Sequence, residues 1–281
     1  MTKGLANENV VVIKVGGSIF KRDAAYRTVA RHLRELVERT TAEQYIVVVS
    51  ARDGETNRLE QLARTLTPMP SARTLDLLWS TGELRSVAFL TLQLEAAGIR
   101  AVGLNIHETG LQVGEDPHAP DGFFSKRESM RSALAEFSVV VVPGFLATNE
   151  DGVITSLGRG GSDFSAVVLA LGLGASRCEL VKDVPGYFAV DPKRDRRARH
   201  LPEISYDEAL GMADSGCELV QRQALVAAAA SGLKLVIRSL KPGEPHTVVG
   251  SASRGILVRT GSPNPRGARM KKRPRNSGSH D

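Results

Sequence analysis

The chain has 281 residues, of which 42% are hydrophobic and 5% aromatic, a composition that suits one large α/β domain or two lobes on a continuous sheet. We find no apolar signal segment and no apolar stretch of membrane-spanning length, so we expect a cytoplasmic protein with no membrane contact. The formal net charge of +6 suggests nucleic-acid binding until the charges are located, because residues 261–281 alone contain six Lys or Arg and one Asp.

The C-terminal segment 261–281 is rich in Pro, Gly, Ser, Asn and Arg, and it cannot bury enough apolar surface to fold. We expect a basic disordered tail. Contact with an anionic partner is the alternative, because clustered positive charge attracts polyanions. Nucleic-acid binding is not expected. The two cysteines, Cys178 and Cys217, match no metal or redox spacing and are interpreted as small buried hydrophobic residues.

Strands and helices alternate in the first hundred residues. Residues 10–15 form an almost purely β-branched run, which is typical of a central strand that is covered on both faces. An amphipathic helix is predicted over 23–39, and a second strand over 45–49. The next predicted elements are helices over 56–66, 73–79 and 82–97 and a short strand over 100–104.

The alternation continues in the second half. Residues 105–127 are rich in Gly and Pro and are predicted to form hairpins or loops. The remaining predicted elements are a helix over 127–136, a strand over 138–142, a helix over 164–172 and a strand over 234–238. This order predicts a three-layer αβα sandwich with a mainly parallel central sheet. Ligands of such sheets bind beyond the carboxyl ends of the strands, where the Gly-rich turns of this chain also fall.

The most informative turn is the run Leu-Gly-Arg-Gly-Gly-Ser-Asp at 157–163, just before a predicted helix. Its glycines allow positive φ and a close approach of the backbone to a ligand, and the helix N-terminus suits an anion. Arg159 can grip a carboxylate with two hydrogen bonds, and Asp163 can accept hydrogen bonds from an ammonium group. The alternative is an ordinary Gly-rich connection with a helix-capping Ser or Asp.

Six motifs in a fixed order resemble the catalytic domain of an aspartokinase, within the amino acid kinase family. They are Lys14-Val15-Gly16-Gly17-Ser18, Val48-Val49-Ser50-Ala51 with Thr56-Asn57, Ser80-Thr81-Gly82-Glu83, Pro143-Gly144-Phe145, the 157–163 run, and Lys182-Asp183-Val184-Pro185-Gly186 with Asp191-Pro192. The resemblance covers about residues 10–240. It implies an amino acid kinase/carbamate kinase-like fold, with a kinase domain at 8–260 that divides into an amino-acid-binding lobe at 8–150 and a nucleotide-binding lobe at 151–260.

The resemblance implies ATP-dependent phosphorylation of the side-chain carboxylate of L-aspartate, which gives 4-phospho-L-aspartate. Mg²⁺ is expected to enter with ATP, held by phosphate and water, and no dedicated protein metal cluster is visible. A homodimer is expected, because the family commonly dimerises through this domain. By position, the implied catalytic residues are Lys14 and Asp183. The implied substrate-binding residues are Ser50, Thr56, Glu83, Arg159 and Asp163. The implied nucleotide-binding residues are Gly16, Gly17, Ser18, Lys182, Asp183, Phe188 and Lys193.

Some of these residues also have structural interpretations. A lysine at the end of a buried strand is costly unless it meets an anion, which favours a functional Lys14. Asp183 is expected to orient the catalytic lysines, but it can also be an ordinary strand-end aspartate. Glu83 suits a ligand ammonium, or it can be a first-turn glutamate that the helix dipole stabilises.

The chain departs from the aspartokinase pattern on the nucleotide side. The family lysine that serves the phosphates corresponds to Glu218, and a carboxylate there would repel phosphate. Lys182 stands where the family commonly has a threonine, and we interpret it as a catalytic residue that supplies the missing charge, held by Glu218 or Asp183. Phe188 and Lys193 replace a family tyrosine and arginine.

Residues 255–259 resemble the close of the kinase domain, and no ACT regulatory pair follows them. An enzyme without ACT regulation, a member of a specialised pathway, or a partner regulatory subunit would each fit. Two other functions stay open. One is a kinase for a related small amino acid or acid in secondary metabolism. The other is a catalytically silent ligand-binding or regulatory homologue.

Overall fold

The computed structural model describes residues 7–113, 127–158, 160–192, 195 and 197–250. Its strands are β1 (Asn7–Val15), β2 (Gln44–Val49), β3 (Ala101–Gly103), β4 (Val139–Pro143), β5 (Leu146–Thr148), β6 (Ile154–Ser156), β7 (Ala175–Val181), β8 (Glu203–Ser205), β9 (Leu235–Arg238) and β10 (His246–Gly250). Its α-helices are α1 (Ala24–Arg39), α2 (Glu55–Leu66), α3 (Ala72–Ala96), α4 (Ile106–Thr109), α5 (Arg127–Glu136), α6 (Gly161–Leu173), α7 (Tyr206–Asp214) and α8 (Arg222–Ser231).

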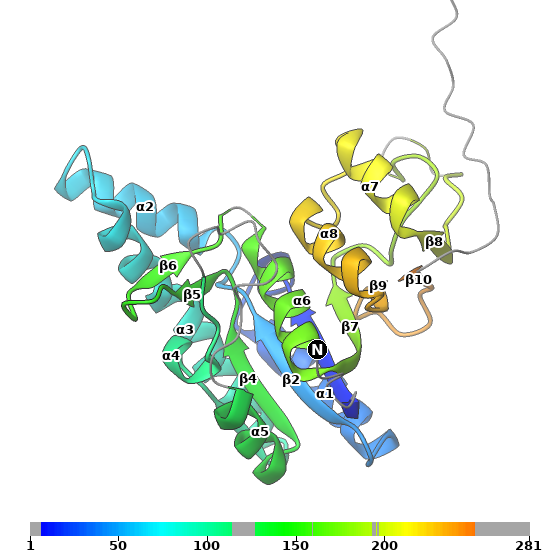
Figure 1. The fold of residues 1–281 in the computed structure, drawn as a ribbon, viewed down its shortest axis with the longest axis horizontal. Coiled ribbons are helices and arrows are strands. Elements are labelled where there is room, and N and C mark those ends of the chain that lie inside the picture. The colour runs from blue at the N-terminus through cyan, green and yellow to red at the C-terminus, as the bar shows by residue number, and fades with distance from the viewer. Residues whose placement is uncertain (1–6, 114–126, 159, 193–194, 196, 251–281) are drawn as a thin grey trace, which may run out of the picture.

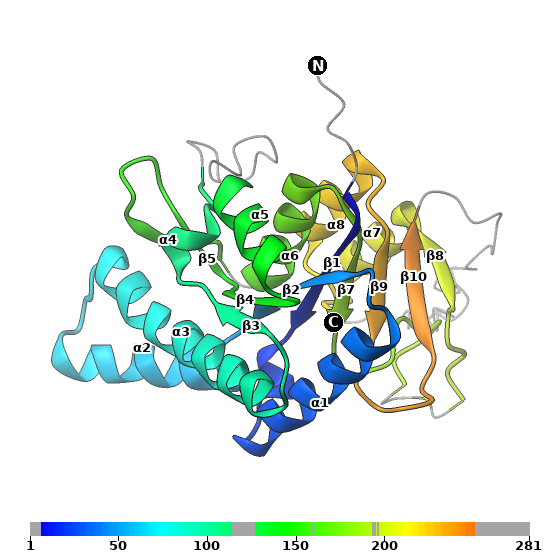
Figure 2. The same ribbon diagram turned by 90° about the horizontal axis from the view of Figure 1, so that it is seen from below.

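Eight strands form one sheet in the order β3-β4-β2-β1-β7-β9-β10-β8 (Figure 1). All pairs from β3 to β9 are parallel, as is the β10–β8 pair, and within the described part of this sheet only the β9–β10 pair is antiparallel. Figure 2 shows α1 and α3 on one face of this sheet and α5, α6 and α8 on the other. The predicted three-layer αβα sandwich with a mainly parallel sheet is therefore confirmed.

The central strands β1, β2 and β4 are apolar along both faces because helices cover both. Val10 and Val12 face the helix α6 side, whereas Val11 and Ile13 face α1 and α3. Their side chains are at most 1% exposed. Burial on both faces explains why the sequence of β1 shows no polar alternation. Because both faces are covered, polar side chains of these strands can leave the sheet only at the strand ends.

One helix prediction is wrong. Residues 72–96 form the single helix α3, although two helices, 73–79 and 82–97, were predicted on either side of Ser80-Thr81. A Cβ at Gly82 would come within 3.3 Å of the side chains of Ala51 and Glu55, so glycine lets α2 and its preceding loop pack closely on α3. This contact offsets the roughly 1 kcal/mol that glycine costs inside a helix. Glu83 therefore lies in mid-helix, and its interpretation as a first-turn glutamate is wrong.

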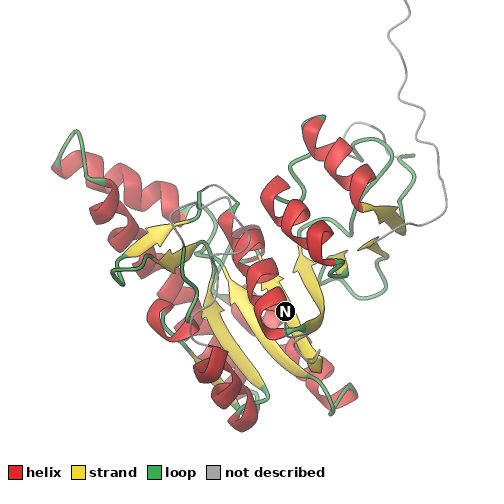
Figure 3. Ribbon diagram, viewed as in Figure 1, coloured by secondary structure: helices red, strands yellow, loops and turns green. Residues whose placement is uncertain are grey.

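Several smaller elements were not predicted. Within 105–127, Asn105 caps the short helix α4 with a full capping box, while 114–126 lie outside the described residues. The β5–β6 hairpin stands apart from the main sheet and contacts α3 (Figure 3). The antiparallel β10 was also missed.

Cys178 is buried in the core, and Cys217 is partly buried against it. In the described part of the chain, no helix is long and apolar enough to cross a bilayer.

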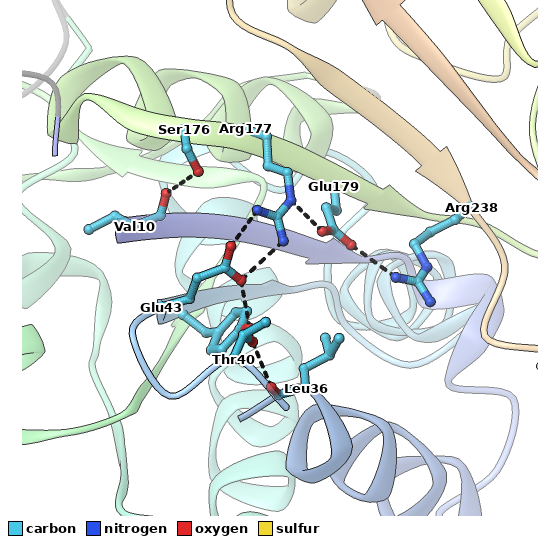
Figure 4. Close-up of polar contacts among 9 residues, drawn as sticks. Val10, Leu36, Thr40, Glu43, Ser176, Arg177, Glu179 and Arg238 are labelled. Carbon is cyan, nitrogen blue, oxygen red and sulfur yellow. Dashed lines mark hydrogen bonds and ion pairs between the residues drawn. The ribbon is translucent and has the colours of Figure 1, made fainter. Parts of the chain in front are cut away.

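A charged network occupies the α1 side of the sheet beyond β1 (Figure 4). Arg177 donates to Glu43 at 2.7 Å and to Glu179 at 2.8 Å, and Arg238 donates to Glu179 at 3.2 Å. Hydrogen bonding to Arg177 lowers the pKa of Glu43, although burial acts in the opposite direction. The network joins β7 and β9 to the loop before β2, and it lies on the face opposite α6.

Candidate active site

Two lysines and one aspartate meet where the central strands end. Lys14 is the last residue but one of β1, Lys182 follows β7, and Asp163 lies in the first turn of α6. The Lys14 ammonium is 2.8 Å from Oδ1 of Asp163, and the Lys182 ammonium is 2.7 Å from Oδ2. Because β1 and β7 are parallel neighbours, their carboxyl ends carry both lysines to the same carboxylate. We call these three residues the lysine–aspartate cluster.

The cluster is buried, and its charges control its protonation. Asp163 is 3% exposed, and burial alone would raise its pKa, but the two ammonium groups outweigh burial and lower it to about 2. Burial is the main reason why the pKa of Lys182 is lowered, against the attraction of Asp163. Asp163 is thus ionised at neutral pH, and two positive charges face one negative charge. This surplus suits an anionic ligand.

The two residues after Val15 are glycines because neighbouring atoms leave little room for a side chain. A Cβ at Gly16 would lie 3.3 Å from the Lys14 ammonium, and one at Gly17 would lie 2.7 Å from the carbonyl oxygen of Ala51. The second contact excludes any larger residue. Ser18 follows in a short 3-10 helix, Gly17–Ile19. The Lys-x-Gly-Gly motif therefore lets the chain turn tightly beside the lysine–aspartate cluster.

A pocket of about 600 Å³, which we call the α3 pocket, opens on one side of the cluster. It brings together five of the residues predicted from the sequence, which are Lys14, Gly17, Ser50, Thr56 and Glu83. Ser50 donates to Ser162 at 3.0 Å. Arg159 lies outside the described residues, but its neighbours Gly158 and Gly160 both line the pocket.

Glu83 is the most perturbed acid of the α3 pocket. It is 2% exposed, and its Oε2 has no hydrogen-bond partner among the described residues. Burial raises its pKa to about 8, although a backbone hydrogen bond from Ala51 and the Lys14 charge act in the opposite direction. The side chain is therefore mostly neutral at pH 7. A ligand ammonium would supply the charge partner that the ionised form needs.

Glu83→Gln is expected to flatten the pH dependence of stability. The folded pKa of Glu83, about 8, lies above its ordinary value of 4.5, so the stability that protonated Glu83 contributes is complete below pH 4.5 and is lost progressively as pH rises from 4.5 through 8. In urea unfolding, the wild type should lose stability between about pH 4.5 and pH 8, and Glu83→Gln should lose distinctly less. Glu60→Gln changes a more exposed acid of the same pocket and should keep the wild-type slope. Equal slopes for all three proteins would contradict this assignment.

A second pocket of about 520 Å³, the α7 pocket, opens on the other side and contains Asp183 and Phe188, as well as Tyr187, Asp191 and Cys217. Lys193 lies outside the described residues. Gly186, with φ +145°, cannot carry a side chain because a Cβ would lie 2.2 Å from Oγ1 of Thr247. Glu218 lines both pockets. The residue at the family lysine position thus stands where the two spaces meet.

The partner of Lys182 differs from the one that the sequence suggested. Its ammonium binds Asp163, whereas Glu218 and Asp183 had been suggested. Lys182 itself lines neither pocket, but its chain neighbour Asp183 lines the α7 pocket, and Ser162, beside Asp163, lines the α3 pocket. The lysine–aspartate cluster therefore lies between the two pockets. Asp163 was predicted to accept hydrogen bonds from a ligand ammonium group. In the structure, each of its two carboxylate oxygens contacts a lysine ammonium group instead.

Sequence reasoning missed two aromatic residues of the α3 pocket. Trp79 and Phe145 both line it, with ring centroids 5.7 Å apart. Phe145 has φ +67°, the only positive φ of a non-glycine residue among those described. The adjoining motifs, Ser80–Glu83 and Pro143-Gly144-Phe145, were the available signals. A backbone conformation of this kind cannot be read from residue types alone.

This architecture defines an α/β protein that can bind two ligands, at least one of them anionic, at the carboxyl edge of its sheet. The chain matches the amino acid kinase family over residues 9–239 and belongs to that family. It is 36% identical over 241 residues to an aspartokinase of Geobacillus stearothermophilus, covering 85% of this chain and 58% of that relative. It is 38% identical over 250 residues to an aspartokinase of Thermus thermophilus, with coverage of 85% and 59%.

Solved structures agree with the family assignment. An aspartate kinase from Synechocystis superposes with a TM-score of 0.74 at 34% identity, over 86% of this chain and 40% of that one. Escherichia coli aspartokinase III, solved with aspartate and ADP, superposes with a TM-score of 0.70 at 24% identity, over 87% of this chain and 65% of that one. At this identity the similarity supports the fold alone. The chain thus spans less than two thirds of the length of these relatives.

Proposed function

We propose that this chain transfers the γ-phosphoryl group of ATP to the side-chain carboxylate of L-aspartate, giving 4-phospho-L-aspartate. The observation that carries the proposal is the lysine–aspartate cluster, which lies between the α3 pocket and the α7 pocket. Phosphoryl transfer needs two ligands held in line and positive charge on the moving group. The similarity to aspartokinases across 85% of the chain supports aspartate as the acceptor.

In this proposal the acceptor occupies the α3 pocket, where Ser50, Thr56 and Glu83 meet it. Glu83 takes the ammonium group, and Arg159 takes the α-carboxylate. An oxygen of the side-chain carboxylate forms a bond to the γ-phosphorus while the bond to the bridging oxygen of ADP breaks. The attacking carboxylate is already ionised at neutral pH, so this step needs no general base.

The nucleotide is assigned to the α7 pocket, against Asp183 and Phe188, and Lys193 is kept as a further predicted nucleotide contact. Gly16, Gly17 and Ser18 present the backbone to the phosphates beside Lys14. In the described part of the chain, no group of three or more His, Cys, Asp or Glu could hold a metal ion. Mg²⁺ is therefore proposed to arrive with ATP, bound mainly by phosphate and water, where it would neutralise phosphate charge.

Lys14 and Lys182 are proposed to supply the two positive charges near the transferring group. Their shared contact with Asp163 supports a positioning role for that carboxylate, in place of the predicted contact with ligand ammonium. Lys182 would then perform the task of the family lysine whose position Glu218 occupies. Asp183, which lines the α7 pocket, adds a negative charge near Lys182.

The proposal has four further parts. The kinase domain divides into lobes at 8–150 and 151–260, the enzyme acts without ACT regulation, it serves a specialised pathway, and it forms a homodimer. Exposed apolar side chains on the α2–α3 hairpin, which projects from the body in Figure 1, are consistent with a second copy binding there. They are Leu62, Leu66, Met69 and Leu77. Glu218 favours one other function, a homologue that binds ligands without transfer, because its charge opposes phosphate.

ADP release over a panel of amino acids and small acids tests the proposed function. L-Aspartate should give the highest rate, and hydroxylamine should trap the acyl phosphate as a hydroxamate. Turnover only with another acid would reject aspartate as the acceptor. Calorimetric binding of ATP·Mg²⁺ and aspartate without ADP formation would favour the silent homologue.

A further inference from the structure

Trp79 brings a buried hydrogen-bond donor to the lining of the α3 pocket. It lies on α3 one turn before Glu83, and its side chain lines the pocket. Its indole Nε1 is buried and has no hydrogen-bond partner among the described residues. A buried donor without a partner costs roughly 1–3 kcal/mol. Such a cost is retained in a binding pocket when a ligand brings the missing acceptor.

Trp79 and Glu83 form a complementary pair. Residues four apart on a helix share a face, so both unpartnered groups approach the pocket from the same side. The indole nitrogen only donates hydrogen bonds, whereas Glu83 only accepts them once it ionises beside a cationic ligand group. Their ligand must therefore offer an acceptor oxygen and a donor group close together. The head of a free α-amino acid, with its α-carboxylate and α-ammonium groups, meets this requirement.

We propose that the Trp79 indole N–H donates to the α-carboxylate of the acceptor while Glu83 accepts from its α-ammonium group. This proposal rests on the proposed function, and it makes Trp79 a specificity-determining residue that selects acceptors with a free α-carboxylate. A carboxylate has about four acceptor positions, so it can accept from the indole and from a further donor at the same time.

Binding of this kind requires a local rearrangement. Nε1 of Trp79 and Oε2 of Glu83 are both shielded from solvent in the structure, so the ligand must displace the groups that cover them. Phe145 is the neighbour suited to this movement, because its ring lies against Trp79 and its backbone holds a positive φ. Strained backbone of this type is concentrated at ligand sites.

Trp79 is the only tryptophan of the chain, so its fluorescence reports on the α3 pocket directly. L-Aspartate should shift or quench the emission of the wild-type protein. ADP, which is assigned to the α7 pocket, should cause a much smaller change. An aspartate-saturated protein with unchanged emission, where calorimetry confirms binding, would overturn the proposal.

Trp79→Phe removes the N–H and keeps an aromatic ring, and it is tested with two ligands. β-Alanine is aspartate without its α-carboxylate, so it keeps the ammonium group and the side-chain carboxylate. By calorimetry, Trp79→Phe should weaken L-aspartate binding about tenfold and leave β-alanine binding unchanged, since only aspartate loses a hydrogen bond to a charged group. A structural defect would weaken both ligands together. Equal losses, or no loss for aspartate, would overturn the proposal.

The two proposals fail in different ways. Phosphoryl transfer to aspartate with no selective effect of Trp79→Phe would reject the role of Trp79 and leave the proposed function intact. A selective loss of aspartate binding in a protein without transfer activity would reject the proposed function and leave the role of Trp79 intact. A wild-type protein that does not bind aspartate would reject both.

Discussion

Asp163→Asn is expected to abolish phosphoryl transfer and to lower the free energy of unfolding by about 3–5 kcal/mol at pH 7. The change removes the negative charge that holds Lys14 and Lys182, and both ammonium groups are then left close together in a buried place. Because the pKa of Asp163 is lowered to about 2, its contribution is present above the unfolded value of 3.8 and is lost as pH falls through 2. Urea unfolding should therefore show the largest deficit near neutral pH.

Asp214→Asn is the matched control. Asp214 pairs with Arg222 at 2.7 Å, but both side chains are more than half exposed. Loss of an exposed ion pair costs about 1 kcal/mol or less. If Asp163→Asn unfolded at the same urea concentration as Asp214→Asn, the lysine–aspartate cluster would not be the buried charge centre that we describe.

Lys182→Met is expected to reduce the rate of phosphoryl transfer by about 10²–10³-fold, which is the usual cost of one positioned donor at the reacting group. Methionine keeps most of the side-chain length and removes the charge. Lys14 still pairs with Asp163 in this variant, so the fold should survive. Lys241→Met, at a lysine side chain that is 74% exposed, should leave the rate unchanged. Full activity of both Lys182→Met and Lys182→Ala would disprove the role of Lys182.

A double variant tests the role of Lys182 by returning the positive charge that Lys182→Met removes. Glu218→Lys places a lysine at the family position, between the two pockets. Added to Lys182→Met, it should restore at least about tenfold of the lost rate, because the positive charge returns to the phosphate side. No recovery would mean that Glu218 does not face the same phosphate oxygens as Lys182.

The layers of the fold were predictable because they depend on patterns along the chain. Runs of β-branched residues at β1 and β4 indicate strands buried on both faces, and α5 has the predicted bounds. The continuity of α3 was not predictable, because Gly82 looks like a helix boundary until its contact with Ala51 is known. Local sequence does not contain that long-range contact.

Several residues that line the two pockets could be named from the sequence, but their contacts could not. Motif order placed Lys14, Glu83 and Asp183 beside pockets, where the structure has them. It did not reveal that Asp163 holds both lysines, because the pairing depends on how β7 and α6 approach β1. Trp79 escaped notice because an apolar helix position usually indicates core packing. Only its unpartnered indole nitrogen identifies it.

A structure of the protein with ADP, Mg²⁺ and L-aspartate tests the central claim most directly. The claim is that the lysine–aspartate cluster serves the phosphates between the α3 pocket and the α7 pocket. We expect the ammonium groups of Lys14 and Lys182 within about 3 Å of phosphate oxygens or of the position between the two ligands, with Glu218 turned away. Phosphates bound away from the cluster, with Lys182 still occupied by Asp163 alone, would contradict the claim.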